Sequence, residues 1–528
     1  MLLSYTDYIE KMHGCWMGKT IGGTLGAPFE CYRGVFDVDF YTQDLTKGPV
    51  PNDDLDLQIA WLNAVEKFGD RVDAQILAEY WLMYVTPYWC EYGAGKNNVR
   101  RGFQPPLSGY LNNLNRDSCG CFIRSEIWAC LAPGLPAVAA KYALEDAIVD
   151  HSNEGVYAEV FCAAMQSAAF VESNLNTIVD IGLSYIPQDS AIYKVVIAVR
   201  DFYNQGKDWK ACRMMILQDF PGTFGEIGGY WKSTEKQEDY PVARAGWDAP
   251  SNIGITVLGL FYGEGDFEKS ICLATNCGED ADCTAGTLAA LMGIISGISG
   301  LPAKWVDPIG DSIATICLSD VEAGEFTVSK TVSDLTRRVA RQLPRFLGPD
   351  RCNCIDTDDK YFIVACDGDA LYNKDRIIGY YRTYTNFLDQ LKLQPFCVKY
   401  ESPMVSMAVD YTEPPYIGAG SVKKIRLHFV NNFMQQQWFN INWHLPQDCL
   451  ISPSKNMTYS LEQWHTNDAR LTVDYEITLP ETLESEKYEL LADISFVGRA
   501  TRVIVPVTFI CTQVPDCDKE DMRWEDDQ

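Results

Sequence analysis

The stretch Gly14–Glu30, GCWMGKTIGGTLGAPFE, places glycine at every fourth residue, at Gly14, Gly18, Gly22 and Gly26. Residues four apart lie on one face of an α-helix, so these glycines form a strip without side chains. Glycine lowers the stability of a helix, and a repeated glycine therefore needs a compensating contact. We predict a helix over this stretch whose glycine face lets another backbone approach closely.

Part of this stretch also resembles a phosphate-binding loop, because Gly18 is followed by Lys19 and Thr20. A P-loop, however, has another glycine five residues before its Gly-Lys-Thr and follows a β-strand. His13 occupies that earlier position, and no alternating strand pattern precedes it. We therefore exclude a P-loop and keep helix packing as the interpretation.

A first acidic motif, NDDLD at residues 52–56, opens a predicted helix whose apolar residues recur at helical spacing over Leu55–Phe68. Asn and Asp are favoured at helix N-termini, so capping alone is one explanation of this motif. Three carboxylates within four residues repel one another, however. A hard cation such as Mg²⁺ or Ca²⁺ would relieve that repulsion, because both ions bind carboxylate oxygens.

A second acidic motif, GEDADC at residues 278–283, leads into the uncharged run Cys283–Ala303. Glycines and Pro302 interrupt this run, so we predict a buried helix here rather than a membrane span. Carboxylates at the start of a buried helix need cationic partners or a metal ion. If the two acidic helix starts converge, they could hold two divalent cations about 3.5–4 Å apart.

Helical spacing continues to about residue 346, and it predicts an all-α domain over residues 1–346. Further predicted helices are Asp73–Tyr84, Val156–Ser173, Ser190–Tyr203 and Ser333–Leu343, the last closed by Pro344. A mixed connector follows at 347–400, and an acidic tail ends the chain at 516–528.

Between the connector and the tail, short segments of alternating polarity are separated by turn residues. This pattern predicts an antiparallel, immunoglobulin-like β-sandwich over residues 401–515. The predicted strands are Val405–Tyr411, Lys424–Val430, Phe439–Trp443, Ala469–Tyr475, Tyr488–Phe496 and Thr501–Phe509.

The composition of the chain excludes some classes of function. The chain has 528 residues, and acidic residues outnumber basic ones 72 to 44, for a formal net charge of −28. This charge disfavours binding to nucleic acid or to anionic membranes and suits an enzyme that binds cations. The 19 cysteines include no C-x-x-C zinc pair, which favours reduced thiols in a cytoplasmic protein. The N-terminus lacks a signal-peptide pattern, in line with the same expectation.

In their order and spacing, these motifs resemble the ADP-ribosylglycohydrolase family. The stretch Gly14–Glu30 is similar to the family's opening helix, which runs from G-x-x-x-G to G-x-P-x-E. Residues 52–54 stand where the family has Thr-Asp-Asp, and His151 matches a His-containing helix start. Residues 278–283 take the place of Gly-Gly-Asp-Thr-Asp-Thr, and residues 300–305 match G-[LI]-P-x-x-W. The resemblance covers about residues 10–310.

The resemblance implies a helical fold around two Mg²⁺ or Mn²⁺ ions. The implied metal ligands are Asn52, Asp53, Asp54, Asp280, Asp282 and Cys283, and the implied catalytic carboxylates are Glu30 and Asp54. Asn52 replaces the Thr of the family's first acidic motif, and Cys283 replaces the final Thr of the second. The amide oxygen of Asn52 can still bind a cation, whereas a thiol is a poor partner for Mg²⁺, so the second ion is expected to bind weakly or to be a different metal.

The predicted substrate-binding residues are His151, Arg124 and Gly278. A helix-cap role for His151 and a structural ion pair for Arg124 are the alternatives. The predicted function is divalent-metal-dependent cleavage of the glycosidic bond of an ADP-ribosyl or related ribosyl substrate, on a small molecule or an ADP-ribosylated partner. A nucleoside or oligosaccharide glycosidase and a non-catalytic ADP-ribose-binding protein are the alternatives, and the sandwich would serve as an oligomerisation or packing module.

Overall fold

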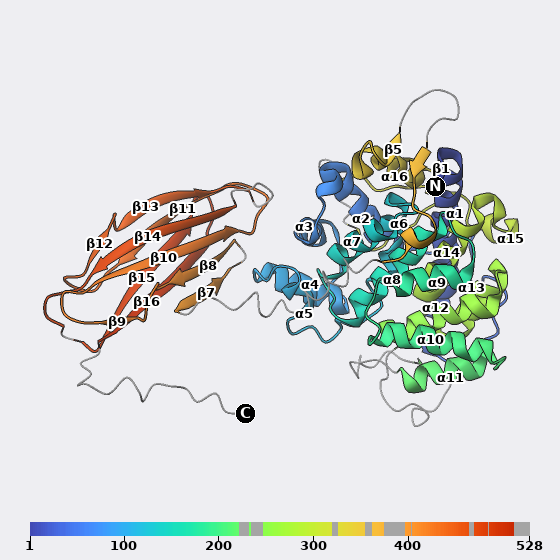
Figure 1. The fold of residues 1–528 in the computed structure, drawn as a ribbon, viewed down its shortest axis with the longest axis horizontal. Coiled ribbons are helices and arrows are strands. Elements are labelled where there is room, and N and C mark those ends of the chain that lie inside the picture. Colours follow the sequence, from blue (N-terminus) through green and yellow to red (C-terminus); the bar gives the residue numbers. More distant parts are fainter. Residues whose placement is uncertain are drawn as a thin grey trace. The chain divides into compact units, whose positions relative to one another are not determined.

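The chain divides into two compact units, one formed by Met1–Val99 with Gln104–Phe387 and the other by Arg100–Phe103 with Leu388–Gln528. This computed structural model describes residues 1–220, 232–233, 246–318, 326–353, 362–373, 396–402, 404–463, 469–483 and 485–511. The first unit is helical and the second is built of β-strands (Figure 1), which confirms the predicted fold class. The predicted acidic tail, 516–528, lies outside the described residues.

The helices predicted from apolar periodicity are all present in the helical unit. Polar residues set where several of them begin: Asn52, Asp73 and Ser190 each accept a hydrogen bond from a backbone N–H of the first turn. In chain order the α-helices are α1 (Tyr5–Gly26), α2 (Asp53–Phe68), α3 (Ala74–Tyr84), α4 (Cys90–Arg100), α5 (Leu107–Tyr110), α6 (Glu126–Leu131), α7 (Pro136–Ala147), α8 (Glu154–Ala169), α9 (Leu175–Leu183), α10 (Ala191–Asn204), α11 (Trp209–Asp219), α12 (Ala249–Gly263), α13 (Phe267–Asn276), α14 (Ala281–Ser296), α15 (Ala303–Val306) and α16 (Val332–Leu347).

Several predicted helix ends are wrong, and the helix predicted to reach Ser173 ends at Ala169. Pro344 does not close α16, which continues to Leu347. Proline removes one backbone hydrogen bond, but Phe346 beyond it is buried and packs against Tyr142, with ring centroids 4.5 Å apart. The run predicted as one helix to Ala303 stops at Ser296, because Gly297 adopts a positive φ of 69° that ends the helix.

The predicted glycine face of α1 packs directly on the backbone of α14. A Cβ atom added at Gly18 would lie 2.6 Å from the carbonyl carbon of Ala289, and Gly14, Gly22 and Gly26 meet α14 or the turn that follows it in the same way. The contact at Gly26 is with Ala281, at the start of α14. Close packing of the two helices therefore holds the end of α1 against the start of α14.

A short sheet strengthens this junction. Strand β2 (Tyr32–Arg33) pairs antiparallel with β4 (Gly278–Glu279) and parallel with β3 (Lys232–Ser233). Gly278 has a φ of 69°, and a Cβ there would lie 2.5 Å from the carbonyl oxygen of Tyr32, so the pairing requires glycine. Arg33 and Glu279 form a buried ion pair at 2.6 Å across the two strands.

Within the stretch predicted as a connector, β5 (Cys352–Asn353) and β6 (Phe362–Val364) join β1 (Leu2–Ser4) in a three-stranded sheet of order β1-β6-β5. This sheet ties the segment that follows α16 to the start of the chain.

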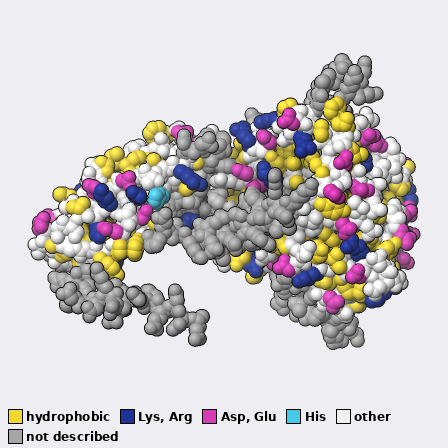
Figure 2. Space-filling model, in the orientation of Figure 1, with side chains coloured by type: hydrophobic (Ala, Val, Ile, Leu, Met, Phe, Trp, Pro, Cys, Tyr) yellow, Lys and Arg dark blue, Asp and Glu magenta, His cyan; other side chains and the backbone are white. Residues whose placement is uncertain are grey.

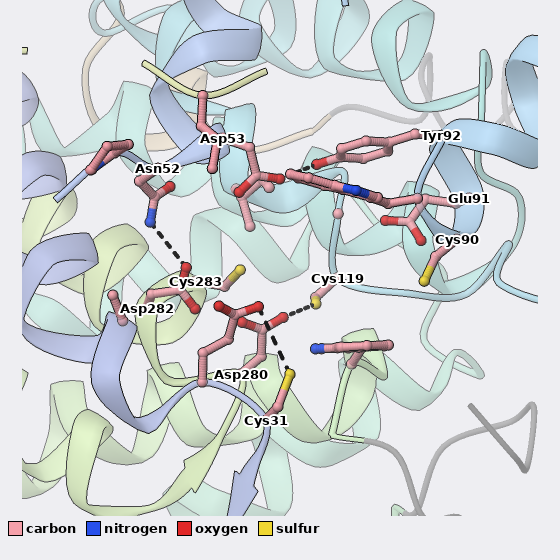
Figure 3. Close-up of a pocket in the computed structure, with 18 residues that line it drawn as sticks. Cys31, Asn52, Asp53, Cys90, Glu91, Tyr92, Cys119, Asp280, Asp282 and Cys283 are labelled. Atoms are coloured by element: carbon pink, nitrogen blue, oxygen red, sulfur yellow. Dashed lines mark hydrogen bonds between the residues drawn. The ribbon is translucent and has the colours of Figure 1, made fainter. Parts of the chain in front are cut away.

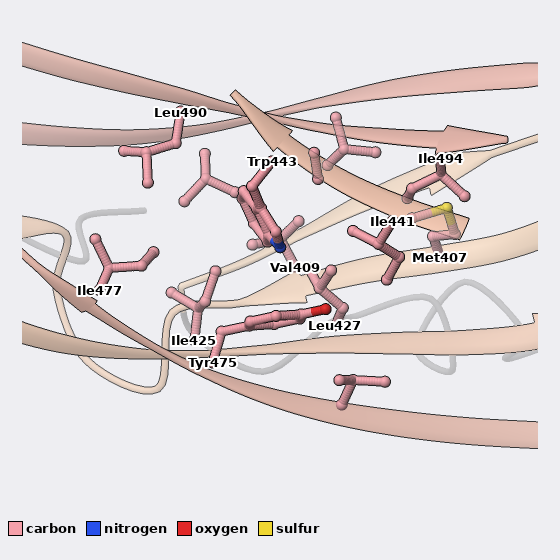
Figure 4. Close-up of a cluster of buried hydrophobic side chains, with 14 of the residues drawn as sticks. Met407, Val409, Ile425, Leu427, Ile441, Trp443, Tyr475, Ile477, Leu490 and Ile494 are labelled. Atoms are coloured by element: carbon pink, nitrogen blue, oxygen red, sulfur yellow. The ribbon is translucent and has the colours of Figure 1, made fainter. Parts of the chain in front are cut away.

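The second unit is a sandwich of two five-stranded sheets, of order β12-β14-β10-β8-β7 and β13-β11-β15-β16-β9. All described pairings in these sheets are antiparallel except that of β9 with β16. Inward-facing side chains such as Ile425, Trp443 and Leu490 form its core (Figure 4). The strands are β7 (Cys397–Glu401), β8 (Val405–Asp410), β9 (Tyr416–Ile417), β10 (Val422–Asn431), β11 (Gln437–His444), β12 (Leu450–Ser452), β13 (Asn456–Leu461), β14 (Arg470–Thr478), β15 (Lys487–Phe496) and β16 (Arg502–Cys511).

On the face drawn in Figure 2, acidic and basic side chains are interspersed over the helical unit. No helix among the described residues has the length and apolarity needed to cross a membrane. The cysteines in the described part of the chain are all free thiols, and most of them are buried.

Candidate active site

Three parts of the helical unit meet around one cavity of about 660 Å³ (Figure 3). They are the segment after α1, the start of α2 and the start of α14. Acidic, thiol and aromatic side chains share the lining: Glu30, Asp53, Glu91, Asp280 and Asp282; Cys31, Cys90, Cys119 and Cys283; and Trp89, Tyr92 and Trp247. The structure thus brings together acidic residues that are more than 220 positions apart in the sequence.

The start of α14 contributes two carboxylates, each with one oxygen free of hydrogen-bond donors. Asp280 accepts a hydrogen bond from the Cys119 thiol at 2.6 Å, and Asp282 accepts one from the Asn52 amide nitrogen at 3.0 Å. The Oδ1 atoms of Asp280 and Asp282 are buried and have no hydrogen-bond partner. Together with an oxygen of Glu30, carboxylate oxygens of both residues lie within 4.8 Å of one another. These three carboxylates form an oxygen-only group that could hold a cation.

The start of α2 contributes the other predicted ligands. Asp53 lines the cavity and accepts a hydrogen bond from the Tyr92 hydroxyl at 2.7 Å. Asp54 lies behind the lining, and an oxygen of it falls within 4.8 Å of ligand atoms of Asp282 and Cys283. The Asn52 amide oxygen, which the sequence predicts to be a metal ligand, accepts the Asp54 backbone N–H at 2.7 Å and caps α2.

Lys19 balances part of this negative charge from behind the cavity. Its ammonium lies 3.0 Å from Asp54 and 3.3 Å from Glu126, and it donates to the Thr287 hydroxyl at 3.2 Å. Burial lowers the pKa of Lys19, but Asp54 and Glu126 outweigh that effect and raise it above its usual value. Lys19, which was first considered as part of a phosphate loop, is therefore a charged partner of the acidic cluster.

The remaining carboxylates crowd one another. The pKa of Glu30 is raised to about 9, mainly by the nearby Asp282 charge and then by burial of the carboxylate, although much of the side chain is exposed. Burial also raises the pKa values of Asp53, Asp280 and Asp282, and neighbouring acidic groups add to the effect. The cluster cannot hold all its negative charges at neutral pH without bound protons or a cation.

Asp56 has a separate role, although it belongs to the same motif. It is fully buried and accepts hydrogen bonds from the backbone N–H groups of Ile316 and Cys317, at 2.7 and 2.6 Å. Its carboxylate therefore fixes the loop around these two residues, and Ile316 lines the cavity.

The structure does not place the three predicted substrate-binding residues in the cavity lining. Arg124 is fully buried and forms ion pairs with Asp146 and Asp150, at 2.8 and 2.7 Å. This arrangement matches the structural alternative for Arg124. His151 is also buried, 2.9 Å from both Asp150 and the Ser118 hydroxyl. Gly278 serves the pairing of β2 with β4 described above.

Several lining residues were not predicted from the sequence. Glu91 and Tyr92 open α4, and Cys119 precedes the turn that holds Arg124. Glu91 is buried and lines the cavity, and its carboxylate lies 4.0 Å from the imidazole of His151, which is not part of the lining. Two aromatic residues, Trp89 and Tyr92, flank Glu91 in sequence, and this concentration of aromatic and acidic residues was the available signal.

The sequence profile of the ADP-ribosylglycohydrolase family matches residues 4–339. No curated protein matches the chain. Among solved structures, an "ADP-ribosylglycohydrolase-related protein complex" is 17% identical with a TM-score of 0.38, and the likeness covers 65% of this chain and 99% of that one. A FixG-related protein from Vibrio parahaemolyticus is 15% identical with a TM-score of 0.17, over 20% of this chain and 95% of that one.

Proposed function

The chain belongs to the ADP-ribosylglycohydrolase family, and on this premise we propose that it is a divalent-metal-dependent hydrolase of a ribosyl glycosidic bond. The observation that carries the proposal is the meeting of Glu30, Asp280 and Asp282 in a cavity of about 660 Å³. Cavities of this size are typical of small-molecule sites.

The residues present fit a divalent cation. Two buried oxygens, Oδ1 of Asp280 and Oδ1 of Asp282, have no hydrogen-bond donor, and an acceptor left in this state is costly unless a cation faces it. Glu30, Asp280 and Asp282 would hold Mg²⁺ or Mn²⁺, because all three offer oxygen. Such an ion would neutralise the cluster and orient vicinal hydroxyls of the sugar.

Among the two predicted catalytic carboxylates, Glu30 is placed to act on a substrate, since it lines the cavity at its exposed side. A carboxylate at this position would stabilise positive charge on the sugar ring as the glycosidic bond breaks. Asp54 is buried behind the lining and paired with Lys19, so its role is to complete the charge balance of the cluster.

The walls of the cavity suit a substrate with an aromatic base. Trp89, Tyr92 and Trp247 line it, and aromatic faces of this kind can stack with a planar base. The described lining contains no Lys, Arg or His. A pyrophosphate would therefore depend on bound cations and helix N-termini for its charge balance, which keeps a nucleoside glycosidase as the second candidate function.

The test is turnover of three substrates by the full chain with Mg²⁺ or Mn²⁺: an ADP-ribosylated protein, free ADP-ribose and a nucleoside. We expect release of ADP-ribose from the protein, loss of this activity in EDTA, and loss in Asp282→Ala. Asp307→Ala, which removes an exposed carboxylate outside the cavity lining, is the matched control and should stay active.

Three other results would support a different function or mechanism. Cleavage of the nucleoside alone would support the second candidate function. Calorimetric binding of ADP-ribose without any turnover would identify a non-catalytic binding protein. Full activity in EDTA or in the Asp282→Ala variant would contradict a metal-dependent mechanism.

A further inference from the structure

Two thiols point into the carboxylate cluster. Cys119 and Cys283 each place Sγ within 4.8 Å of the other and of a carboxylate oxygen of Asp280. The three residues are 3%, 7% and 3% exposed, in that order, and all of them line the cavity (Figure 3). We propose that Cys119, Cys283 and Asp280 form a Zn²⁺ site that adjoins the oxygen-only group of Glu30, Asp280 and Asp282.

The two sulfur ligands and one carboxylate favour Zn²⁺ over the other common divalent cations. Zn²⁺ binds thiolate and carboxylate ligands in a tetrahedral arrangement, and sites with three protein ligands leave the fourth position to water or substrate. Mg²⁺ demands oxygen ligands in a nearly octahedral arrangement, which two sulfur atoms cannot supply. Soft thiolates thus favour Zn²⁺ at this position over Mg²⁺ or Mn²⁺.

A second observation points to a cation here, independently of the sulfur atoms. Oδ1 of Asp280 is buried without a hydrogen-bond donor, while its other oxygen accepts the Cys119 thiol at 2.6 Å. Cys283 faces a carboxylate as well, because its thiol donates to Asp54 at 3.6 Å. Both thiols therefore contact carboxylate oxygens, and a Zn²⁺ ion would take the place of the thiol proton between Cys119 and Asp280.

Among the described cysteines, only Cys119 and Cys283 belong to a group of ligand atoms that lie within 4.8 Å of one another. Cys121, two residues after Cys119, is equally buried, but its thiol donates to the backbone oxygen of Gly155 at 2.6 Å and it is not in the cavity lining. It belongs to none of the groups of ligand atoms that come within 4.8 Å of one another. Cys121 is therefore a matched control in burial and in sequence position.

Metal binding at this site releases protons. Two thiols and one Zn²⁺ give two thiolate–zinc bonds and release the two thiol protons to solvent, together with any proton held by the carboxylates, with no oxidation or reduction. Because the site is argued from its own ligands, it does not depend on the chain cleaving a glycosidic bond. Its presence and the proposed hydrolysis can fail separately.

The experiment uses the full chain, stripped of metal by a chelator and titrated with Co²⁺ as a spectroscopic substitute for Zn²⁺. We expect a near-ultraviolet band from thiolate-to-cobalt charge transfer, which Zn²⁺ abolishes by displacement and a large excess of Mg²⁺ leaves in place. Cys119→Ser and Cys283→Ser should each weaken this band by at least half, and Cys121→Ser should retain it. Cys283→Thr, which replaces the sulfur by oxygen, should lower the preference for Zn²⁺ over Mn²⁺ at least tenfold.

Release of at least two protons per Zn²⁺ by the wild-type chain, measured in weak buffer, tests the site without any variant. The proposal is overturned if Co²⁺ binds without a thiolate band, if the band survives both serine substitutions, or if Zn²⁺ releases no protons. A chain that shows the band but hydrolyses no substrate would keep the zinc site and lose the proposed function. A chain that hydrolyses its substrate without the band would do the reverse.

Discussion

Substitution of Gly18 by alanine tests how strictly the helix pair α1–α14 holds the site together. A Cβ at this position would lie 2.6 Å from the carbonyl carbon of Ala289. Carbon atoms in contact lie about 3.5–4.0 Å apart, so the two helices must separate by roughly 1 Å. The obstacle is backbone, and no side-chain rotation can relieve it.

The expected cost follows from two opposing terms. Alanine favours a helix over glycine by about 1 kcal/mol, whereas overpacking of a close interface costs about 1–3 kcal/mol or more. Gly23→Ala, on another side of the same helix, is the control, because the new Cβ would lie 3.0 Å from only the side-chain nitrogen of Asn52. The gain in helix propensity is the same in both variants, so their difference isolates the packing term.

Thermal unfolding of both variants provides the measurement. At about 2.1 cal/mol/K per residue, a packing cost of about 3 kcal/mol lowers the Tm of a unit of this size by roughly 4 °C relative to Gly23→Ala. Because Glu30 and Asp282 sit at the ends of the same helix pair, Gly18→Ala should also weaken divalent-cation binding. A Gly18→Ala variant as stable as Gly23→Ala would refute the idea that backbone contact between α1 and α14 determines the position of the site.

Three further predictions follow from buried charges. Burial raises the pKa of Glu79 to about 7, above its unfolded value, so its contribution to stability should fall by at most roughly 3 kcal/mol as the pH rises from about 4.5 to 7. Other buried carboxylates lower the stability of both proteins over this range, so urea unfolding at pH 5 and pH 8 should show a larger fall in the wild type than in Glu79→Gln, and an equal fall in both would disprove it. Arg124→Ala leaves Asp146 and Asp150 buried without their cation, so urea unfolding should show a loss of about 3–5 kcal/mol, and a loss below about 1 kcal/mol would show that the two carboxylates find other partners. Free Mn²⁺ at 100 times its Kd should stabilise the wild type by about 2.7 kcal/mol, seen as a rise in Tm that EDTA reverses; an equal rise in Asp282→Ala would place the ion elsewhere.

The sequence was most informative for elements with a buried face. All six predicted strands are present, and each of them lies between two other strands of its sheet. The strands that were not predicted in the sandwich, β7, β9, β12 and β13, are the edge strands of the two sheets. An edge strand buries fewer side chains, as in β13, where only Leu461 is fully buried. Its polarity pattern is correspondingly weak.

For the site, local motifs identified the acidic helix starts but not the residues that face them. Glu30, Asp53, Asp280 and Asp282 were all predicted from motifs and all line one cavity. Cys119 was interpreted as one more buried thiol, because the sequence does not show that it lies opposite Asp280. The position of such a residue depends on packing between distant segments, which periodicity and capping rules do not describe.

The two departures from the family's threonines have a shared physical effect. Asn52 donates its amide hydrogen to Asp282, and Cys283 donates its thiol hydrogen to Asp54. Each of these side chains thus directs a hydrogen-bond donor at a carboxylate of the cluster. A threonine hydroxyl can turn its oxygen to a cation, whereas the Asn52 amide is held by its cap to Asp54, so Asp282 is left with Oδ1 for a metal. On the proposed function, the departures would therefore confine a hard cation to the side of the cluster where Glu30 and the Oδ1 atoms of Asp280 and Asp282 meet, with the sulfur donors on the other side.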